Sequence, residues 1–289
     1  MLGQELTKAL TSANATSVLL ADRAAVDITD ADAVRRAVSR LGPCGVVLNA
    51  AGWTNVDAAE AHEDEALAVN GTAVGVLASA CRRSGAALIH VSTDYVLGAL
   101  MLGGAVRDVD SRYREDSPTA PINAYGRTKL DSERAVLELC PEAGYVVRTA
   151  WLYGRHGRNF VSTMLDLAAV RETVDVVDDQ VGQPTWTHDV ARRMVEIGYQ
   201  RPRPGVYHGV ASGEGSWYEL ARAAFAGAGL DPERVRPVST ADFPLPAPRP
   251  ARSVLSQDRW ADAGMSAFGP WRDMLARAYR AGTFAGSAR

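Results

Sequence analysis

The fold is decided by the stretch AALIHVSTDY, residues 86–95. The apolar run from Ala87 to Val91 has the length and composition of a buried strand, and polar side chains follow it directly. Runs rich in Val, Leu and Ile recur along the chain with Ala-rich helical segments between them, at Ser17 to Ala21, Val46 to Ala50, Ala86 to Ser92 and Tyr145 to Thr149. This alternation predicts an α/β fold, in which helices cover both faces of a doubly wound parallel sheet.

Two helices are expected between these strands, at Asp30 to Leu41 and at Glu65 to Ser84. In the second, Leu67, Val74 and Leu77 recur at helical spacing. After about residue 150 the composition changes, because prolines break the chain into shorter elements. The sequence therefore predicts a Rossmann-type sheet followed by a smaller C-terminal lobe.

Bulk composition argues against several classes of protein. The 289 residues are 47% apolar and 22% charged with a formal net charge of −3, so no basic surface is expected to hold nucleic acid. No apolar stretch approaches the length of a membrane span, and the first residues lack the layout of a signal peptide. The three cysteines have no CxxC spacing, which favours a reducing, cytoplasmic setting. Because HExxH and GxSxG strings are absent, neither a catalytic metal nor a serine hydrolase is expected.

The string YGRTK places Tyr125 and Lys129 four residues apart. On a helix both side chains lie on one face, about one turn from each other. An ammonium group beside a phenol stabilises the phenolate and lowers the pKa of the phenol from about 10, toward the range in which it exchanges protons with a carbonyl oxygen. The alternative is a solvated tyrosine beside a surface lysine.

Polar residues at the ends of two predicted strands are further candidates. Residues Ser92 to Tyr95 follow the apolar strand, and open α/β sheets bind ligands at the carboxyl ends of their strands. A hydroxyl there can hydrogen-bond a substrate carbonyl; alternatively, these residues cap a turn. Residues Asn49 to Gly52 either let a dinucleotide approach the backbone or make a tight strand exit. Residues Asp27 to Asp30 form an N-cap signature, which is compatible with a second role at an adenine.

Eleven strings spread along the whole chain together resemble the dTDP-4-dehydrorhamnose reductases, a family of extended short-chain dehydrogenases. The later strings are the more diagnostic, because many extended short-chain enzymes share YxxxK while few share a VDDQxGxPT segment. In chain order, the matching strings are residues 3–6, 27–30, 49–57, 69–70, 92–96, 125–129, 148–154, 159–160, 177–185, 216–218 and 249–253.

The resemblance implies roles for individual residues in the reduction of a 4-keto sugar. Tyr125 would donate a proton to the keto oxygen as hydride arrives from the nicotinamide. Lys129 would lower the pKa of Tyr125 and bind the nicotinamide ribose, and Thr93 would orient the carbonyl. Positions that contact the sugar are matched by Asp94 and Trp151, and the nucleotide phosphates are expected to face Arg249 and Arg252. Positions that line the cofactor are matched by Met1, Leu2, Asp27, Ile28, Ala50, Ala51, Gly52, Val91, Tyr125 and Lys129.

The resemblance also implies a domain organisation. Residues 1–150, together with about 187–207, would form the NAD(P)-binding domain, and residues 151–289 would mainly form the substrate-binding lobe. The family's first strand and most of its Gly-rich turn have no counterpart before Gly3. Either the start codon is misassigned or the product is inactive; the intact later motifs favour misassignment, and we expect better cofactor binding by an upstream-extended chain. The loop from Gly98 to Tyr113 is longer than the family pattern and is expected near the sugar.

Several alternatives stay open on the sequence alone. The cofactor is NADPH or NADH, since Asp22 suits a ribose 2′-hydroxyl and Arg23 suits a 2′-phosphate. Two further questions are open: whether the protein holds a structural Mg²⁺, for which Glu5 is the matched ligand position, and whether it is a monomer or a homodimer.

The expected substrate is dTDP-4-dehydro-6-deoxy-L-mannose, which is reduced to dTDP-L-rhamnose. The alternatives are a reductase of another dTDP-keto-sugar, such as a dihydrostreptose-type precursor, and a non-catalytic sugar-nucleotide-binding relative.

Overall fold

The computed structural model describes residues 1–13, 15, 17–98 and 112–285, so the expected loop from Gly98 to Tyr113 lies almost wholly outside the described residues. A parallel sheet stands at the centre of the molecule, and its strands follow the order β1-β2-β3-β8. These strands are β1 (Val46–Asn49), β2 (Ala87–Thr93), β3 (Gly144–Thr149) and β8 (Gly205–His208).

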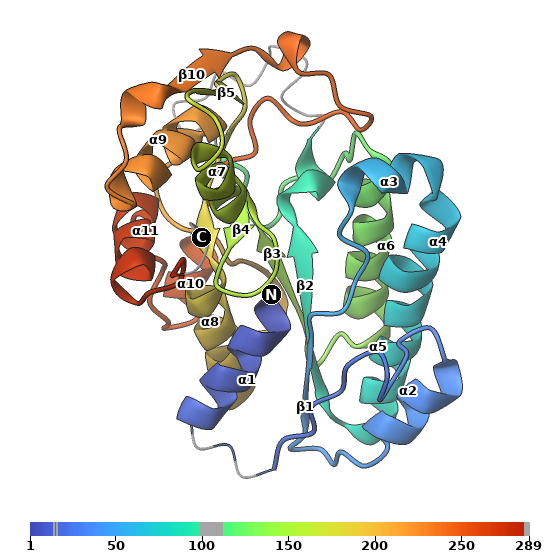
Figure 1. Cartoon of the computed structure of the whole chain (residues 1–289). Helices are drawn as coiled ribbons and strands as arrows, with labels where there is room; N and C mark the ends of the chain where they lie inside the picture. Colours follow the sequence, from blue (N-terminus) through green and yellow to red (C-terminus); the bar gives the residue numbers. More distant parts are fainter. Residues whose placement is uncertain (14, 16, 99–111, 286–289) are drawn as a thin grey trace.

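Helices cover both faces of this sheet (Figure 1). One face packs against α1 (Leu2–Ser12) and α8 (Thr187–Gln200), and the other packs against α2 (Ala31–Val38), α5 (Ala73–Ser84) and α6 (Ala124–Leu139). The doubly wound α/β fold predicted from the alternation of strands and helices is therefore confirmed.

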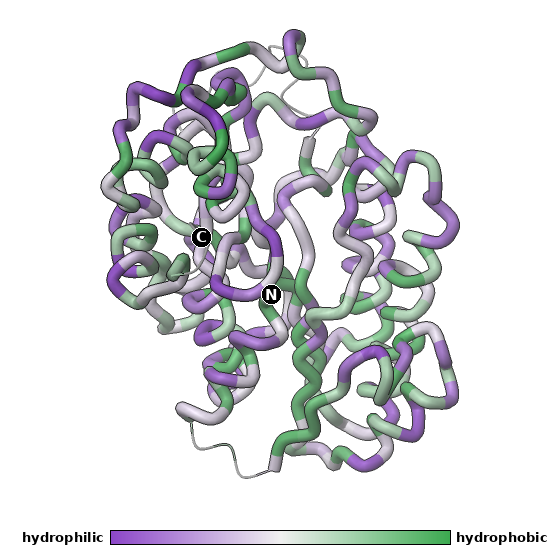
Figure 2. The backbone as a smooth tube through the Cα atoms, viewed as in Figure 1, coloured by the Kyte–Doolittle hydropathy of each residue, from purple (hydrophilic) through white to green (hydrophobic). Residues whose placement is uncertain are grey.

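Successive residues of β2 supply the two hydrophobic cores on opposite faces of the sheet. Leu88 belongs to the core under α2 and α5, while Ile89 belongs to the core under α1 and α8. Neighbouring side chains of a strand point to opposite faces, so a strand buried on both sides must be apolar at every position. Figure 2 shows this as a continuous hydrophobic stretch along the lower half of the central strands.

The expected strand from Ser17 to Ala21 is wrong. The described residues of this segment form no strand, and the side chains of Val18, Leu19 and Leu20 are 43%, 59% and 58% exposed. An extended segment becomes a strand only when a neighbour accepts its backbone hydrogen bonds. Among the described residues, no strand lies beside it to do so.

The two expected helices are present with altered limits. The first, α2, starts after Asp30, whose side chain accepts the backbone N–H groups of Asp32 and Ala33 as the N-cap signature predicts. The second is a helical run with a wide turn inside it: α4 (Glu63–Leu67), a π-helical turn η1 (Ala68–Thr72) and then α5. Such π-turns insert one residue and are common at functional sites.

A smaller lobe is built mostly from residues after 150, above and to the left of the sheet in Figure 1. Its helices are α7 (Phe160–Ala168), α9 (Trp217–Gly227), α10 (Asp258–Asp262) and α11 (Trp271–Arg280). Its strands form short pairs: β4 (Leu152–Tyr153) with β7 (Thr185–Trp186), β5 (Val174–Val177) with β10 (Val235–Val238), and β6 (Val181–Gly182) with β9 (Gly215–Ser216). The remaining elements are α3 (Val56–Ala61) and the short turns η2 (Asp94–Leu97), η3 (Pro232–Arg234) and η4 (Thr240–Asp242).

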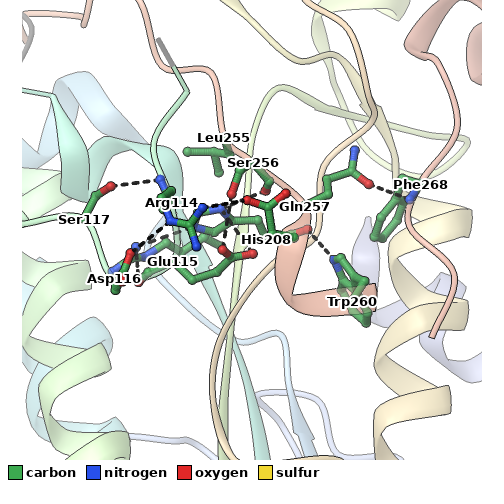
Figure 3. A network of polar contacts seen from close by, with 12 residues as sticks. Arg114, Glu115, Asp116, Ser117, His208, Leu255, Ser256, Gln257, Trp260 and Phe268 are labelled. Atoms are coloured by element: carbon green, nitrogen blue, oxygen red, sulfur yellow. Dashed lines mark hydrogen bonds and ion pairs between the residues drawn. The ribbon is translucent and has the colours of Figure 1, made fainter. Parts of the chain in front are cut away.

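A polar network fastens the segment at residues 113–117 to the C-terminal part of the chain (Figure 3). The backbone of Ser256 donates to the carbonyl of Tyr113, and its hydroxyl donates to Glu115 Oε2 at 3.2 Å. The carbonyl of Ser256 lies 3.0 Å from Nδ1 of His208 at the end of β8. Burial and the nearby Arg148 guanidinium lower the pKa of His208 to about 3, so this imidazole is neutral at pH 7.

One ion pair in this region is fully buried. Arg148 on β3 and Glu133 on α6 have side chains only 3% and 2% exposed, and the guanidinium donates to both carboxylate oxygens at 2.9 and 2.7 Å. A bidentate pair of this kind fixes the helix against the strand, and neither charge is stable there alone.

We therefore expect Glu133→Gln to lower the free energy of unfolding by about 3–5 kcal/mol, because it leaves the Arg148 charge buried without its counter-ion. The matched control is Asp131→Asn, which breaks an exposed pair with Arg134 on the same helix and is expected to cost about 0–1 kcal/mol. Urea unfolding measures both values. Equal losses in the two variants would contradict the prediction.

Candidate active site

Tyr125 lies in the first turn of α6. Asn123 caps this helix by accepting the backbone N–H of Gly126 at 2.7 Å, and its amide donates to the carbonyl of Pro248 at 2.9 Å. Glu60 adds a second support by accepting the N–H of Ala124 at 2.8 Å. The start of the helix is thus fixed from both lobes, and the tyrosine is fixed with it.

Gly126 allows this turn to approach the end of β2 closely. A Cβ at position 126 would lie 2.5 Å from the carbonyl oxygen of Tyr95, a distance that no side chain tolerates. The absence of a side chain brings the ring of Tyr125 edge-on to the ring of Tyr95, with centroids 6.0 Å apart. The Tyr–Gly pair in YGRTK therefore places the phenol against the polar end of the strand.

The end of β2 carries the hydroxyl and carboxylate that the sequence singled out. Thr93 and Asp94 are both buried, and the Thr93 hydroxyl donates to Asp94 Oδ1 at 3.0 Å. Thr93 also caps η2 by accepting the N–H of Tyr95 at 3.3 Å, so the alternative reading of these residues as a turn cap is correct as well. Thr93 also acts on Tyr125, whose pKa it lowers, and the Tyr125 ring lies edge-on to that of Tyr95, so Thr93, Asp94 and Tyr125 form one cluster.

Lys129 lies one turn further along α6 and is buried rather than solvated. Its Nζ donates to the carbonyl oxygen of Val91 at 2.6 Å and lies 3.0 Å from Nε2 of His90. Burial lowers the pKa of Lys129 from 10.5 to about 8, although the charge of Glu133 acts in the opposite direction. The predicted helix thus brings Tyr125 and Lys129 to the end of the same strand.

His90 of β2 lies in a buried polar network. Asn49 Oδ1 accepts the N–H of Ala51 at 3.0 Å, which turns the Asn49 amide nitrogen toward His90 Nδ1 at 2.9 Å. The other ring nitrogen, Nε2, faces the Lys129 amine. That Nε2 lies 2.9 Å from the hydroxyl of Ser132, which in turn donates to the carbonyl of Lys129. Burial and the Lys129 charge keep the pKa of His90 well below its usual value, so the imidazole stays neutral.

The structure corrects the expected effect of Lys129 on Tyr125. Instead of being lowered, the pKa of Tyr125 is raised to about 12, first by burial and then by the charge of Asp94, although the Thr93 hydrogen bond acts the other way. Sequence spacing placed the amine near the phenol, but the amine is directed to the strand carbonyl. Tyr125 is consequently a protonated phenol at pH 7, which is the form that gives a proton to a developing alkoxide.

The segment after β1 is suited to a dinucleotide that lies across the strand ends. Ala50, Ala51 and Gly52 are exposed and small. Asn70, in the π-turn η1, accepts the N–H of Trp53 at 2.9 Å and donates to the hydroxyl of Thr128 at 3.1 Å. A Cβ at Gly52 would lie 3.1 Å from Asn70 Oδ1, so a larger residue at position 52 would displace the side chain that holds this segment in place. These residues fit a cofactor that needs close approach to the backbone.

The other expected cofactor residues lie apart from this cluster. Met1 precedes α1 beside the loop at Gly154 and Gly157, and Leu2 is buried in the core beneath α1 and α8. Asp27 accepts both the backbone N–H and the hydroxyl of Thr29, at 2.9 and 2.7 Å, and these bonds lower the pKa of its carboxyl. Ile28 packs at the border of the core under α2.

Trp151 has an unusual backbone and a stacked partner. Its φ of 45° lies in the left-handed region, which costs a residue with a Cβ about 1–3 kcal/mol. Its indole stacks on Trp217 with ring centroids 3.5 Å apart and planes 4° apart. Gly182 leaves room for it, since a Cβ there would lie 2.5 Å from the indole. The expected sugar-contacting residue is therefore held by aromatic residues of the C-terminal lobe.

The two arginines expected at the phosphates both pair with carboxylates. Arg249 forms two hydrogen bonds to Asp57, at 2.5 and 2.8 Å, and its charge lowers the pKa of Tyr95 next to the cluster. Arg252 forms two hydrogen bonds to Glu214, at 2.8 and 2.6 Å. A phosphate group would compete with these carboxylates for each guanidinium.

The expected magnesium position at Glu5 is not supported. Within the described ranges, no three side chains of His, Cys, Asp or Glu gather in a way that would hold a metal ion. Glu5 lies 3.3 Å from Lys8 and within 3.5 and 3.6 Å of His156 and His188.

The described part of the chain also contains no helix with both the length and the apolar character of a membrane span.

A family model described as the RmlD substrate binding domain matches residues 1–283. The chain belongs to this family. A dTDP-4-dehydrorhamnose reductase of Streptomyces griseus is 47% identical over 285 residues, covering 97% of this chain and 90% of the relative. A dTDP-4-keto-6-deoxy-D-glucose reductase of Streptomyces niveus is 46% identical, covering 96% and 93%. The crystal structure of dTDP-4-dehydrorhamnose reductase from Bacillus anthracis in complex with NADP is 31% identical with a TM-score of 0.86, covering 97% of this chain and 95% of that one.

Two residues of this RmlD-family chain escaped sequence reasoning. His90 sits inside the apolar strand and meets Lys129 only through the packing of α6, and Ser253 donates to Asp94 Oδ2 across 159 residues of chain. Ser253 is part of a family string, but its type alone gives no sign of a partner. Neither contact has a local pattern that the sequence displays.

Lys129 offers a direct test, because the sequence has only one other lysine, Lys8. In protein labelled with ¹³C at lysine Cε, we expect the resonance that is lost in Lys129→Met to titrate with a midpoint of about 8. Lys8→Met assigns the other resonance. A Lys129 midpoint near the ordinary value of 10.5 would show that the amine is not buried as described.

The lowered pKa of Lys129 also makes the free energy of unfolding depend on pH. The folded state releases the Lys129 proton near pH 8 and the unfolded chain near pH 10.5, so between these values the unfolded state binds more protons. We expect the free energy of unfolding of the parent chain, relative to Lys129→Met, to rise across this window. Urea unfolding at a series of pH values measures the difference.

Proposed function

We propose that this protein is an NAD(P)H-dependent dTDP-4-dehydrorhamnose reductase, which reduces dTDP-4-dehydro-6-deoxy-L-mannose to dTDP-L-rhamnose. The observation that carries this proposal is the cluster of Tyr125, Thr93 and Lys129 at the carboxyl end of β2 in a chain that belongs to the RmlD family. Relatives named as dTDP-4-dehydrorhamnose reductases at 47% identity support the sugar.

Each residue of the cluster has a part in the reduction. When bound, the reduced nicotinamide supplies the hydride that goes to the carbonyl carbon of the sugar. Tyr125 gives its proton to the keto oxygen, because burial keeps the phenol protonated until an alkoxide, a stronger base, develops beside it. Thr93 holds the phenol through its hydroxyl and orients the keto oxygen. The Lys129 amine, with donors beyond the one used on Val91, binds the nicotinamide ribose.

The remaining residues bind the two ligands. Residues 1–150, with about 187–207, bind the cofactor, through Met1, Leu2, Asp27, Ile28, Ala50, Ala51, Gly52 and Val91. Residues 151–289 mainly bind the sugar nucleotide, with Trp151 at the sugar beside Asp94, and with Arg249 and Arg252 at the phosphates. Small exposed residues after β1 and paired guanidiniums near Tyr95 support this division.

The decisive assay supplies the dTDP-4-keto sugar with reduced cofactor and identifies the product by NMR. We expect Tyr125→Phe to lower kcat by about 100-fold or more, because it removes the proton donor and keeps the ring. Tyr145→Phe, which removes a hydroxyl bonded to Pro202 in the same protein, is the matched control. Full turnover by Tyr125→Phe would refute the role of Tyr125, and no cofactor consumption by the parent chain would refute the reductase itself.

The same assay separates the proposed sugar from its rival. The relative of Streptomyces niveus is named for a dTDP-4-keto-6-deoxy-D-glucose substrate, so that sugar is the second candidate. The L-manno substrate is expected to give the higher kcat/KM. A higher value for the D-gluco substrate would move the assignment to the second candidate while leaving the chemistry intact.

We further propose NADPH as the preferred cofactor. Asp22 already accepts the backbone N–H groups of Ala24 and Ala25, whereas the side chain of Arg23 is 89% exposed and pairs with Asp27 on the surface. Arg23 is therefore the group with capacity for a 2′-phosphate. The bound NADP of the Bacillus anthracis relative supports this choice.

Arg23→Gln is expected to lower kcat/KM for NADPH by roughly tenfold or more and to leave NADH turnover unchanged, because it removes a charge-assisted hydrogen bond to one cofactor only. Arg40→Gln removes an exposed charge of the same lobe and serves as the control. Equal losses with both cofactors would contradict the assignment of Arg23.

A further inference from the structure

The carboxylate of Asp94 has one donor on each of its oxygens, and the two donors come from different parts of the chain. Oδ1 accepts from the hydroxyl of its neighbour Thr93 at 3.0 Å. Oδ2 accepts from the hydroxyl of Ser253 at 2.5 Å. All three side chains are buried, with Asp94 and Ser253 each 2% exposed. Because the carboxylate is buried, its charge depends on the donors that the protein supplies, which are these two hydroxyls and the backbone N–H groups of Asp94 and Tyr95.

The hydroxyl of Ser253 is held in place by the backbone around it. The N–H of Ser253 donates to the carbonyl of Val181 at 3.0 Å, and the N–H of Val181 donates to the carbonyl of Ala251 at 2.9 Å. Two residues later, the N–H of Leu255 donates to the side chain of Gln183 at 2.7 Å. Residues 251–255 are therefore fixed against residues 181–183, and Ser253 reaches Asp94 from a rigid support.

The charge on Asp94 acts on the tyrosine that carries the proton. Burial raises the pKa of Asp94 to about 6, while the hydrogen bonds from Ser253 and Thr93 lower it. In its charged form Asp94 raises the pKa of both Tyr125 on α6 and Tyr95 on η2, and the Arg249 guanidinium opposes that effect at Tyr95. These groups are the titratable and charged neighbours of the carboxylate on the elements packed around it.

We propose that Ser253 is a positioning residue of the active site, whose hydroxyl holds Asp94 in its charged form beside Thr93 and so links the C-terminal lobe to the protonation of Tyr125. A charged Asp94 accepts a hydrogen bond from the Thr93 hydroxyl, whose oxygen accepts the backbone N–H of Tyr95 and keeps its remaining lone pair for Tyr125. A neutral Asp94 carries a proton of its own, and the orientation of the Thr93 hydroxyl is no longer fixed. The competent state is the one with Asp94 charged.

The proposal rests on the proposed function only for its kinetic readout, because the titration of Asp94 is measurable without turnover. In protein labelled with ¹³C at the aspartate carboxyl carbons, Asp94→Asn identifies the resonance. The parent chain is expected to show an Asp94 midpoint of about 6. In Ser253→Ala the midpoint should rise by about one unit, a tenfold gain in proton affinity, because the charged form loses a donor.

A conservative variant and a matched control keep the test specific. Ser253→Thr retains the donor and should restore the parent midpoint. Ser256→Ala is the matched control, because Ser256 is a buried serine of the same segment whose hydroxyl bonds to Glu115 instead (Figure 3). Its Asp94 midpoint should equal that of the parent chain. If Ser253→Ala does not fold, Ser253→Cys supplies a weaker donor and should give a smaller shift in the same direction.

The kinetic readout follows from the sign of the shift. Activity should fall as the pH drops through the Asp94 midpoint, and in Ser253→Ala this acidic limb of kcat should move up by about one pH unit while KM for the cofactor stays the same. An unchanged Asp94 midpoint in Ser253→Ala, or an equal change in Ser256→Ala, would overturn the proposal. Absence of turnover in the parent chain would instead count against the proposed reductase and leave the titration result valid.

Discussion

The hydrogen bond of 2.6 Å between Lys129 Nζ and the carbonyl oxygen of Val91 ties α6 to the central strand β2. A buried amine must find an acceptor, and the strand backbone supplies it at the point where pairing with β1 ends. This bond sets the rotation of α6 about its own axis. With Lys129 fixed, the residue one turn earlier, Tyr125, has to lie over the end of the strand beside Thr93. The ion pair between Glu133 of the same helix and Arg148 of β3 then keeps α6 from rotating.

The protonation states of the residues in the site are set by burial and not by neighbouring charges alone. His90 stays neutral, Tyr125 stays protonated, and Lys129 holds its proton less tightly than a free lysine, and in each case burial is the first cause. Asp94 is the acid of the site whose pKa, about 6, lies within reach of neutral pH. The site therefore combines Tyr125, a phenol of raised pKa, with the carboxylate of Asp94, which two hydroxyls keep charged. An arrangement of this type suits donation of a proton to a strong base and resists its loss to water.

Sequence reasoning recovered what local pattern encodes and failed where a partner elsewhere decides the outcome. Strands β1, β2 and β3 were predictable because each contains a short run of apolar residues between helical segments, and the Tyr125–Lys129 pair was predictable because helical spacing is local. The segment Ser17 to Ala21 has the same composition, but no described strand lies beside it. The raised pKa of Tyr125 and the reach of Ser253 to Asp94 depend on burial and on contacts distant in sequence, which residue types do not reveal.

The contact between Trp151 and Gly182 limits which amino-acid substitutions this part of the chain tolerates. The indole occupies the space that a Cβ at residue 182 would need, and the left-handed backbone at residue 151 holds it there. A change at position 182 is therefore tolerable only after the indole has gone, while loss of the indole leaves Trp217 without its stacking partner. Substitutions at residues 151 and 182 therefore have to occur together. A library that randomises residue 182 alone meets the indole at every larger side chain, whereas one that randomises both positions together can repack this part of the C-terminal lobe.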